Sequence, residues 1–172
     1  MQRRPGGDGP GDEHGQVSAG SSDAATATDV PQPRVGVLRG ARSATPAGAK
    51  AYAAHWVELL NQAVARGTGE WLRESGPDCV TCRRMADGID GLTETGGHVT
   101  GEGWLLQRVV AQPGLPDKQA ELGLEVLRRP EAIVASEGAD PEYREGGNER
   151  YLMKLEHDGT TWHVIELAPV LR

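Results

Sequence analysis

Hydrophobic residues at the start of the apolar part of the chain recur with a helical period. Between residues 46 and 65 they fall three or four positions apart, which places them along one side of a helix. Thr45 before Pro46 is typical of a capping residue followed by proline in the first turn. Gly67 follows the last apolar position and suits a helix end. The pattern therefore predicts a helix over residues 46–65.

Two further helices are expected next. Residues 68–74 carry Trp71 and Leu72 as candidate buried contacts, and Ser75-Gly76-Pro77 then interrupts the helical pattern. Asp78 is expected to cap a third helix over residues 79–95. The apolar stripe of the third helix consists of Cys79, Cys82, Met85, Ala86, Ile89 and Leu92.

Strand patterns follow Gly96-Gly97. Residues 103–112 are predicted to form one strand, and a clear alternation of polar and apolar residues begins at Lys118. Pro130 bends the continuation of this run or places it at a sheet edge. Residues 138–147 are expected to be a polar loop. The apolar face of the alternating run consists of Ala120, Leu122, Leu124 and Val126.

The last two strands are predicted over residues 149–157 and 161–167, on either side of Asp158-Gly159. This dipeptide between two alternating segments is a strong hairpin signal. The order of elements is thus three helices and then a four-stranded antiparallel meander. We therefore expect an α+β fold in which the three N-terminal helices pack on one curved four-stranded sheet.

Composition divides the chain. Residues 1–45 are rich in Gly, Pro, Ser, Thr, Asp and Ala and contain no Phe, Trp or Tyr. Such a segment cannot bury enough apolar surface to offset the entropy lost on ordering. We predict that residues 1–45 are a disordered polar tether and that residues 46–172 form the α+β domain.

The net charge of −7 excludes one class of partner. Residues 1–45 contain five basic and five acidic residues, so the negative charge belongs to the predicted domain. An acidic domain repels phosphate backbones, and we therefore expect no nucleic-acid partner.

The only two cysteines, Cys79 and Cys82, are three residues apart. A pair without a spare suits a disulfide in an oxidising compartment, and such a short loop contributes about 1–3 kcal/mol. A redox pair is an alternative, although the motif follows a helix rather than a strand. A zinc site is another, since His98 follows at a suitable spacing, but a fourth ligand is missing near Trp104. We expect the disulfide, no metal ligand and no cofactor.

Five features together resemble a family of actinobacterial lipoproteins catalogued as domain of unknown function 6318. The resemblance covers residues 46–168. It rests on Ala-Tyr-Ala-Ala-His-Trp-Val-Glu-Leu-Leu-Asn at 51–61, Cys79-Val-Thr-Cys82, residues 89–97, Gly101-Glu102-Gly103-Trp104, and Asp158-Gly159 with Trp162.

The resemblance implies an extracytoplasmic domain anchored by a lipidated N-terminal cysteine. It also implies a cone like that of nuclear transport factor 2, or of cystatin, in which helices and a curved sheet enclose a cavity. The family has no established activity, so no catalytic residue is transferred. This sequence departs from the family pattern because it has no lipidation cysteine: the first cysteine is Cys79.

Location is interpreted from the tether. Arg3 and Arg4 are not followed by an apolar stretch, so the start is not a signal peptide, and no apolar run reaches the length of a membrane span. A polar tether before a compact domain suits a protein held off a membrane surface. We expect an extracytoplasmic, membrane-associated location through a lipid anchor outside this sequence, added after an upstream export segment. A cytoplasmic location is the alternative.

Aromatic residues are the remaining candidates for a site. The chain has no Phe, so a small number of Trp and Tyr residues must supply the aromatic core. The alternative is that some of them line a pocket on the concave side of the sheet. The candidate pocket residues are Tyr52, Trp56, Trp104, Tyr151 and Trp162.

No other side chain forms a catalytic motif. His55, His157 and His163 have no accompanying Ser or Cys nucleophile, and Asp87 and Asp90 are expected to lie on a solvated helix face. We therefore predict a non-enzymatic domain at the cell envelope that binds a partner protein or a small apolar ligand. One alternative is an enzyme of the ketosteroid-isomerase type that uses the cone cavity. Another is a cytoplasmic redox or metal module.

Overall fold

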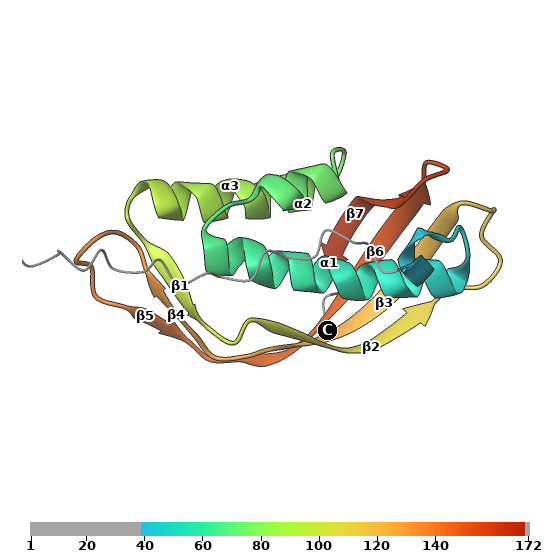
Figure 1. Ribbon diagram of the computed structural model, residues 1–172. Coiled ribbons are helices and arrows are strands. Elements are labelled where there is room, and N and C mark those ends of the chain that lie inside the picture. The colour runs from blue at the N-terminus through green and yellow to red at the C-terminus, as the bar shows by residue number, and fades with distance from the viewer. Residues whose placement is uncertain (1–38, 171–172) are drawn as a thin grey trace, which may run out of the picture. The chain divides into compact units, whose positions relative to one another are not determined.

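The computed structural model describes residues 39–170, which form an α+β unit (Figure 1). The helical elements are η1 (Arg39–Arg42), α1 (Pro46–Arg66), α2 (Glu70–Ser75) and α3 (Val80–Glu94). The strands are β1 (His98–Gly101), β2 (Trp104–Ala111), β3 (Gln119–Arg128), β4 (Glu131–Val134), β5 (Glu142–Arg144), β6 (Gly147–His157) and β7 (Trp162–Pro169). The predicted α+β class is confirmed.

The ends of α1 are those that the sequence predicted. The Thr45 hydroxyl accepts a hydrogen bond from the Gly48 amide at 3.1 Å, and Pro46 occupies the first turn. Gly67 ends the helix in the left-handed region, with φ 67°, and its amide donates to the carbonyl groups of Ala63 and Val64.

The start of α3 differs from the prediction. Cys79, rather than Asp78, is the N-cap residue, because its sulfur accepts the Cys82 amide at 3.1 Å. The helix thus begins at Val80, and the side chain that caps it also forms the cross-link described below.

The strands form two antiparallel sheets, which corrects the prediction of one four-stranded meander. One sheet has the order β2-β3-β6-β7 and contains the four strands predicted from alternation and turn signals. The other has the order β1-β4-β5. β5 lies within residues 138–147, where a loop was expected, and β1 was not predicted. Both are short and have no alternating burial, so they leave no pattern in the sequence.

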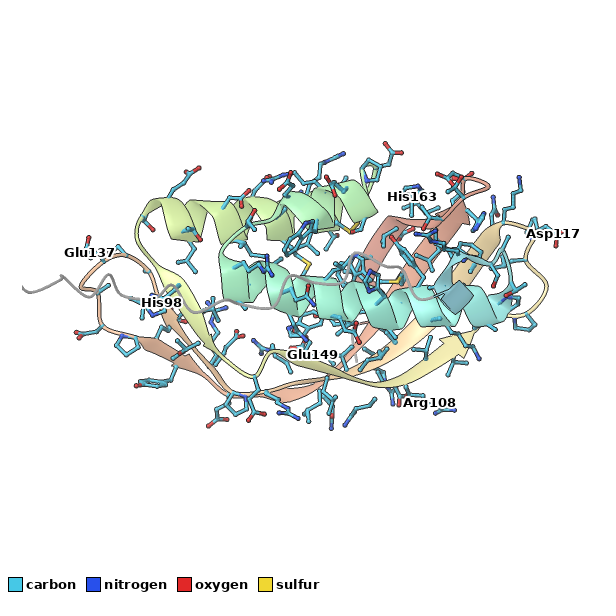
Figure 2. All side chains as sticks on the ribbon, in the orientation of Figure 1. His98, Arg108, Asp117, Glu137, Glu149 and His163 are labelled. Carbon is cyan, nitrogen blue, oxygen red and sulfur yellow. A yellow bond between two sulfur atoms is a disulfide. The ribbon has the colours of Figure 1, made fainter. Side chains whose placement is uncertain are left out.

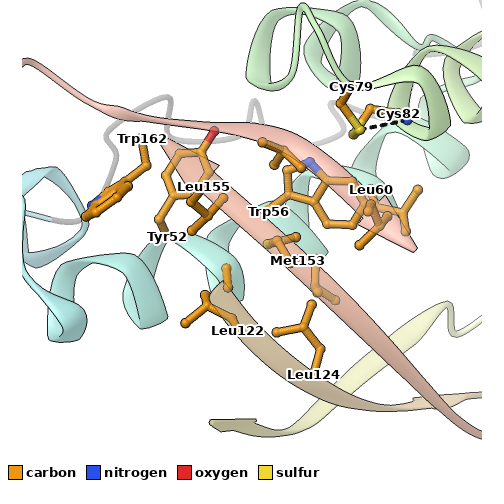
Figure 3. Packing of buried hydrophobic residues seen from close by; sticks show 14 of the residues in the cluster. Tyr52, Trp56, Leu60, Cys79, Cys82, Leu122, Leu124, Met153, Leu155 and Trp162 are labelled. Atoms are coloured by element: carbon orange, nitrogen blue, oxygen red, sulfur yellow. Dashed lines mark hydrogen bonds between the residues drawn. A yellow bond between two sulfur atoms is a disulfide. The ribbon is translucent and has the colours of Figure 1, made fainter. Parts of the chain in front are cut away.

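The core lies between the helices and the four-stranded sheet (Figures 1 and 3). α1 packs on β2 and β3, while α2 and α3 pack on β7. The alternation predicted for β3 is confirmed, because its apolar face is at most 8% exposed. The largest fully buried side chains include Trp56, Trp162, Leu72, Leu122, Leu124, Met153 and Leu155.

The folded part begins earlier than the predicted boundary at residue 46. Ala41 in η1 is fully buried, and the Trp162 indole donates to the Ser43 carbonyl at 3.0 Å. The His157 ring contacts the Arg42 carbonyl at 2.8 Å from Nε2, while its Nδ1 accepts the Gly159 amide at 3.0 Å. Residues 39–45 therefore belong to the domain, and the remainder of the predicted tether lies outside the described residues. Among residues 39–170, no helix is both long and apolar enough to cross a membrane.

Candidate binding site

Cys79 and Cys82 are joined by a disulfide, with a Cα–Cα distance of 5.2 Å. Both residues are fully buried. The neighbouring Gly76 has no room for a side chain, because a Cβ atom would lie 2.9 Å from the Val164 carbonyl and 3.0 Å from the Cys79 Cβ. The cross-link therefore packs the corner between α2 and α3 against β7, and a reactive thiolate, which needs exposure, does not fit this position.

Within residues 39–170, no three side chains of the His, Cys, Asp or Glu type are grouped closely enough to hold an ion.

The five predicted pocket residues do not converge on one cavity. Trp56 is fully buried, and its indole donates to the Ser75 hydroxyl at 3.1 Å. The Tyr52 hydroxyl donates to the carbonyl of Ser75 at 3.2 Å, and burial raises the pKa of this phenol. Figure 3 shows Tyr52, Trp56 and Trp162 within the core beside β6. Trp56 is thus a core residue that also fastens α1 to α2.

Two of the five, Tyr52 and Trp162, line a cleft of about 150 Å³ together with α2. Ligand pockets are usually about 300–1,000 Å³. The cleft is therefore too small for a typical ligand.

The other two, Trp104 and Tyr151, stack on each other with ring centroids 5.1 Å apart. The Tyr151 hydroxyl donates to Oε2 of Glu149 at 2.6 Å, and burial, together with Glu149, raises the pKa of the phenol. Arg128 places its Nε 3.0 Å from Oε1 of the same carboxylate. Figure 2 shows Glu149 on the helix side of the sheet, so a tyrosine and a carboxylate meet on the inner face.

A cavity of about 470 Å³, referred to below as the main cavity, lies between α1 and the three-stranded sheet β1-β4-β5, the small sheet. Its walls combine apolar and polar residues: Asn61, Gln62, Val64, Ala65, Val99, Thr100, Gly101, Glu102, Gly103 and Glu131. A more open groove of about 760 Å³ runs along β4 and β5 and shares Thr100, Gly101 and Glu131 with this cavity. The cavity therefore adjoins the outer groove at these shared residues, and its volume lies in the range of small-molecule sites.

The Gly101-Glu102-Gly103-Trp104 segment shapes the floor of this cavity. The Asn61 amide on α1 accepts the Trp104 backbone N–H and donates to the Trp104 carbonyl, both at 2.8 Å. Gly103 has φ 72°, and a Cβ atom there would lie 2.4 Å from Oδ1 of Asn61. Only glycine permits this close approach between loop and helix.

Sequence reasoning missed this cavity, although it singled out the segment that forms it. The Gly-Glu-Gly-Trp pattern carried the family resemblance and was not assigned to a site. Asn61 and Glu131, which lie far from it along the chain, complete the walls. The signal available in the sequence was Asn61, the last residue of the helical segment 51–61 on which the family resemblance rested.

The histidines and aspartates described next mainly hold turns together and lie away from the main cavity. Asp158 accepts the backbone amides of Thr161 and Thr160 and contacts His163 at 3.0 Å; the pKa of Asp158 is lowered, most strongly by the Thr161 amide. Asp90 is not merely solvated, as it accepts the Gly69 amide at 2.7 Å. None of these residues lines the main cavity.

Comparison with solved structures supports the fold. The intermembrane space region of the chloroplast protein ARC6 matches with a TM-score of 0.54 at 12% identity, over 73% of this chain and 95% of that one. A calcium/calmodulin-dependent protein kinase II association domain from Xanthomonas campestris gives a TM-score of 0.42 at 15% identity, over 74% and 91%. A protein whose name begins with Rd1NTF2 gives 0.39 at 11% identity, over 71% and 99%. At these identities the ARC6 likeness shows the fold alone.

None of the curated proteins matches the chain. One family model does match, over residues 19–168, and it includes the helix, the cysteine pair and the Gly-Glu-Gly-Trp segment on which the resemblance rested. The chain therefore belongs to the family of unknown function DUF6318.

Proposed function

We propose that this chain is a non-enzymatic binding domain that works outside the cytoplasm, at the cell envelope, in the manner of a tethered lipoprotein. The observation that carries the proposal is the cavity of about 470 Å³ at the Gly-Glu-Gly-Trp segment. Its occupant is a small molecule with an apolar part, or a side chain of an envelope partner that enters along the outer groove.

The proposed architecture is a cone of the nuclear-transport-factor-2-like type. Two bulges in the four-stranded sheet, at Leu106/Arg108 and Lys154/Leu155, support a curved sheet, since bulges bend strands. In such a cone the helices and the curved sheet enclose a cavity, and the cavity at the small sheet is the candidate for it.

The buried disulfide supports the location. Disulfides persist in oxidising compartments and are rare in the cytosol. Cys79 and Cys82 are fully buried, and Cys79 caps α3, as expected for a structural cross-link. Protein isolated from its native host and unfolded without reductant should take up no alkyl groups; uptake of two would contradict the proposed location.

The binding proposal is tested by closing the cavity. Val99→Trp places a large side chain in the cavity wall, while Val110→Trp adds the same group at an exposed position of β2 and serves as the matched control. A fragment panel is screened by amide chemical shifts of Gly101, Gly103 and Trp104. We expect fragments that shift these amides in the wild type and in the Val110 variant but not in the Val99 variant. The absence of any such fragment would contradict the proposal.

An enzyme of the ketosteroid-isomerase type is the second candidate, and one observation favours it: Tyr151 and Glu149 meet on the inner face of the sheet. The tyrosine donates to the carboxylate itself, and Arg128 pairs with that carboxylate, so both groups already have partners. Conversion of an unconjugated ketosteroid to its conjugated isomer, abolished by Glu149→Gln, would establish this candidate in place of the first.

A further inference from the structure

We infer that the main cavity binds an organic cation, a primary ammonium or guanidinium group carried on a short alkyl chain. This inference rests on the proposed binding function and names the ligand class of the same cavity. Three observations support it: the hydrogen-bonding character of the walls, the balance of charge around them, and the apolar and aromatic surface beside the charge.

The polar side chains of the cavity walls mainly accept hydrogen bonds. The side-chain oxygen and nitrogen of Asn61 both form hydrogen bonds with the Trp104 backbone. The Thr100 hydroxyl donates to the Ala132 carbonyl at 3.5 Å. The remaining groups are the amide of Gln62, whose Oε1 has no hydrogen-bond partner, and the carboxylates of Glu102 and Glu131. Among the described residues that line the cavity there is no Lys, Arg or His. A ligand that donates hydrogen bonds therefore fits these walls.

The charges around the cavity do not balance. Arg128 is shared between two carboxylates, with Nε 3.0 Å from Glu149 and Nη1 3.4 Å from Glu131. Arg129 pairs with Glu102. Only Glu102 and Glu131 of these three carboxylates line the cavity, and the cluster of three carboxylates and two guanidinium groups carries one excess negative charge. A monovalent cation would complete the balance.

Glu131 is the carboxylate best placed to bind the cation. Its side chain is only 16% exposed, so an attraction to a ligand is screened less than at the surface. Its position is fixed by the backbone, because Glu131 pairs with Gly101 across β1 and β4. A Cβ atom on Gly101 would lie 3.2 Å from the Cα and Cβ atoms of Glu131. The glycine therefore allows the carboxylate-bearing strand to approach the cavity floor.

The surroundings suit an alkyl chain and a cation. Val64, Ala65 and Val99 form the apolar part of the cavity wall. In the adjoining groove, the Tyr143 ring is 80% exposed, and an exposed aromatic face attracts ammonium and guanidinium groups. The one arginine that lines the groove, Arg144, pairs with Glu142 at 3.2 Å.

The test compares ligands of one size and three charges on the full chain. n-Butylguanidinium and n-butylammonium are titrated against n-butanol and butyrate, with the amides of Gly101, Gly103 and Trp104 as the readout. We expect saturable shifts with both cations, at least about tenfold tighter than with butanol, and weaker binding at high salt. Butanol or butyrate binding as tightly as the cations would overturn the inference while leaving the binding function intact. No shift with any probe would contradict both.

A variant identifies the carboxylate. Glu131→Gln keeps the shape of the side chain and removes its charge, and we expect at least about tenfold weaker cation binding. Glu125→Gln is the matched control, since Glu125 lies on β3 within reach of Arg108 and Arg150, away from the cavity. Equal affinity in the two variants would overturn the assignment of Glu131. The comparison of charged and neutral ligands on the wild type remains decisive if Glu131→Gln does not fold.

A third arm separates the two sources of the cationic group. N-acetyl-arginine amide and N-acetyl-lysine amide carry the same groups attached to a peptide backbone. Binding of these amides as tight as that of the alkyl cations indicates a partner's side chain as the occupant, and their exclusion indicates a free small molecule. Both results require that the simple alkyl cations bind.

Discussion

The two sheets of this domain differ in how many of their side chains are buried. The inner face of the four-stranded sheet is filled by α1, α2 and α3, and Leu122, Val126, Met153 and Val164 there are fully buried. In the three-stranded sheet no residue of β4 is buried and every residue of β5 is exposed. The main cavity lies at this second, sparsely packed end. The difference separates a packed region, which carries the stability, from an open region, where we propose that binding takes place.

Asn61 and Trp104 lie where the two regions meet. The helix that covers the packed sheet ends beside the cavity, and the Asn61 amide ties it to the first residue of β2. This contact holds the open end in place without filling it. Substitutions in the packed region, at this junction and at the attachments around it should therefore have different effects.

The largest effect is expected in the packed region. Trp56→Ala removes a fully buried indole and its hydrogen bond to Ser75, and it should lower the free energy of unfolding by about 3–5 kcal/mol. Tyr143→Ala, the aromatic counterpart in the small sheet, is expected to change it by less than about 0.5 kcal/mol because Tyr143 is largely exposed. Urea unfolding measures both. Equal losses would refute the division into a packed and an open region.

A smaller loss is expected at the junction. Asn61→Ala leaves the backbone N–H and carbonyl of Trp104 without their partners, at a cost of about 2–3 kcal/mol. The amides of Gly101 and Gly103 should shift strongly, since the loop loses its attachment to α1. The neighbouring Gln62→Ala, which removes no such pair, is the control. A variant with wild-type stability and unchanged loop amides would show that the contact does not hold the cavity.

Removal of the disulfide should cost slightly less. Cys79→Ser with Cys82→Ser opens a loop of only a few residues, for which chain entropy predicts about 2 kcal/mol. Because this cross-link packs against β7, we expect the cavity amides to keep their positions. Intact mass with and without reductant confirms the bond in the wild type. A double variant as stable as the wild type would leave the cross-link without a structural role.

The smallest effect is electrostatic and depends on pH. The Gly69 amide and then Arg73 lower the pKa of Asp90. A carboxyl group whose pKa is lower in the folded state adds stability above its unfolded value, about 3.9, and this contribution is lost as the pH falls toward the folded pKa. Asp90→Asn should therefore lose less than about 1 kcal/mol at neutral pH and converge with the wild type in acid. Asp87→Asn, which lacks the amide contact, is the control. A difference that grows in acid would contradict the assignment.

The packed region could be predicted from the sequence because its pattern is local. Capping residues fix the ends of α1, and the alternation in β3 marks its buried face. β1 and β5 have four and three residues without buried side chains, so burial leaves no periodic trace in them. Cys79 rather than Asp78 caps α3, since its sulfur accepts the Cys82 amide at 3.1 Å, and a cysteine cap is not expected from capping preferences.

The site was harder to predict because its walls come from distant segments. Tyr52 of α1 and Trp162 of β7 share a small cleft, whereas Trp104 and Tyr151, from the two strands that flank β3, stack on another part of the inner face. Asn61 and Trp104 are 43 positions apart, a separation at which no spacing rule applies. The family pattern indicated the segment, and its role depends on the helix beside it.

Amide hydrogen exchange on the intact chain tests the division between the two regions most directly. We expect slow exchange, close to the global limit, in β3 and β6, and exchange at least about a hundredfold faster in β1, β4 and β5 because few side chains are buried there. Slow exchange throughout both sheets would show that the small sheet is part of the packed core and would contradict the account of a cavity kept open at that end.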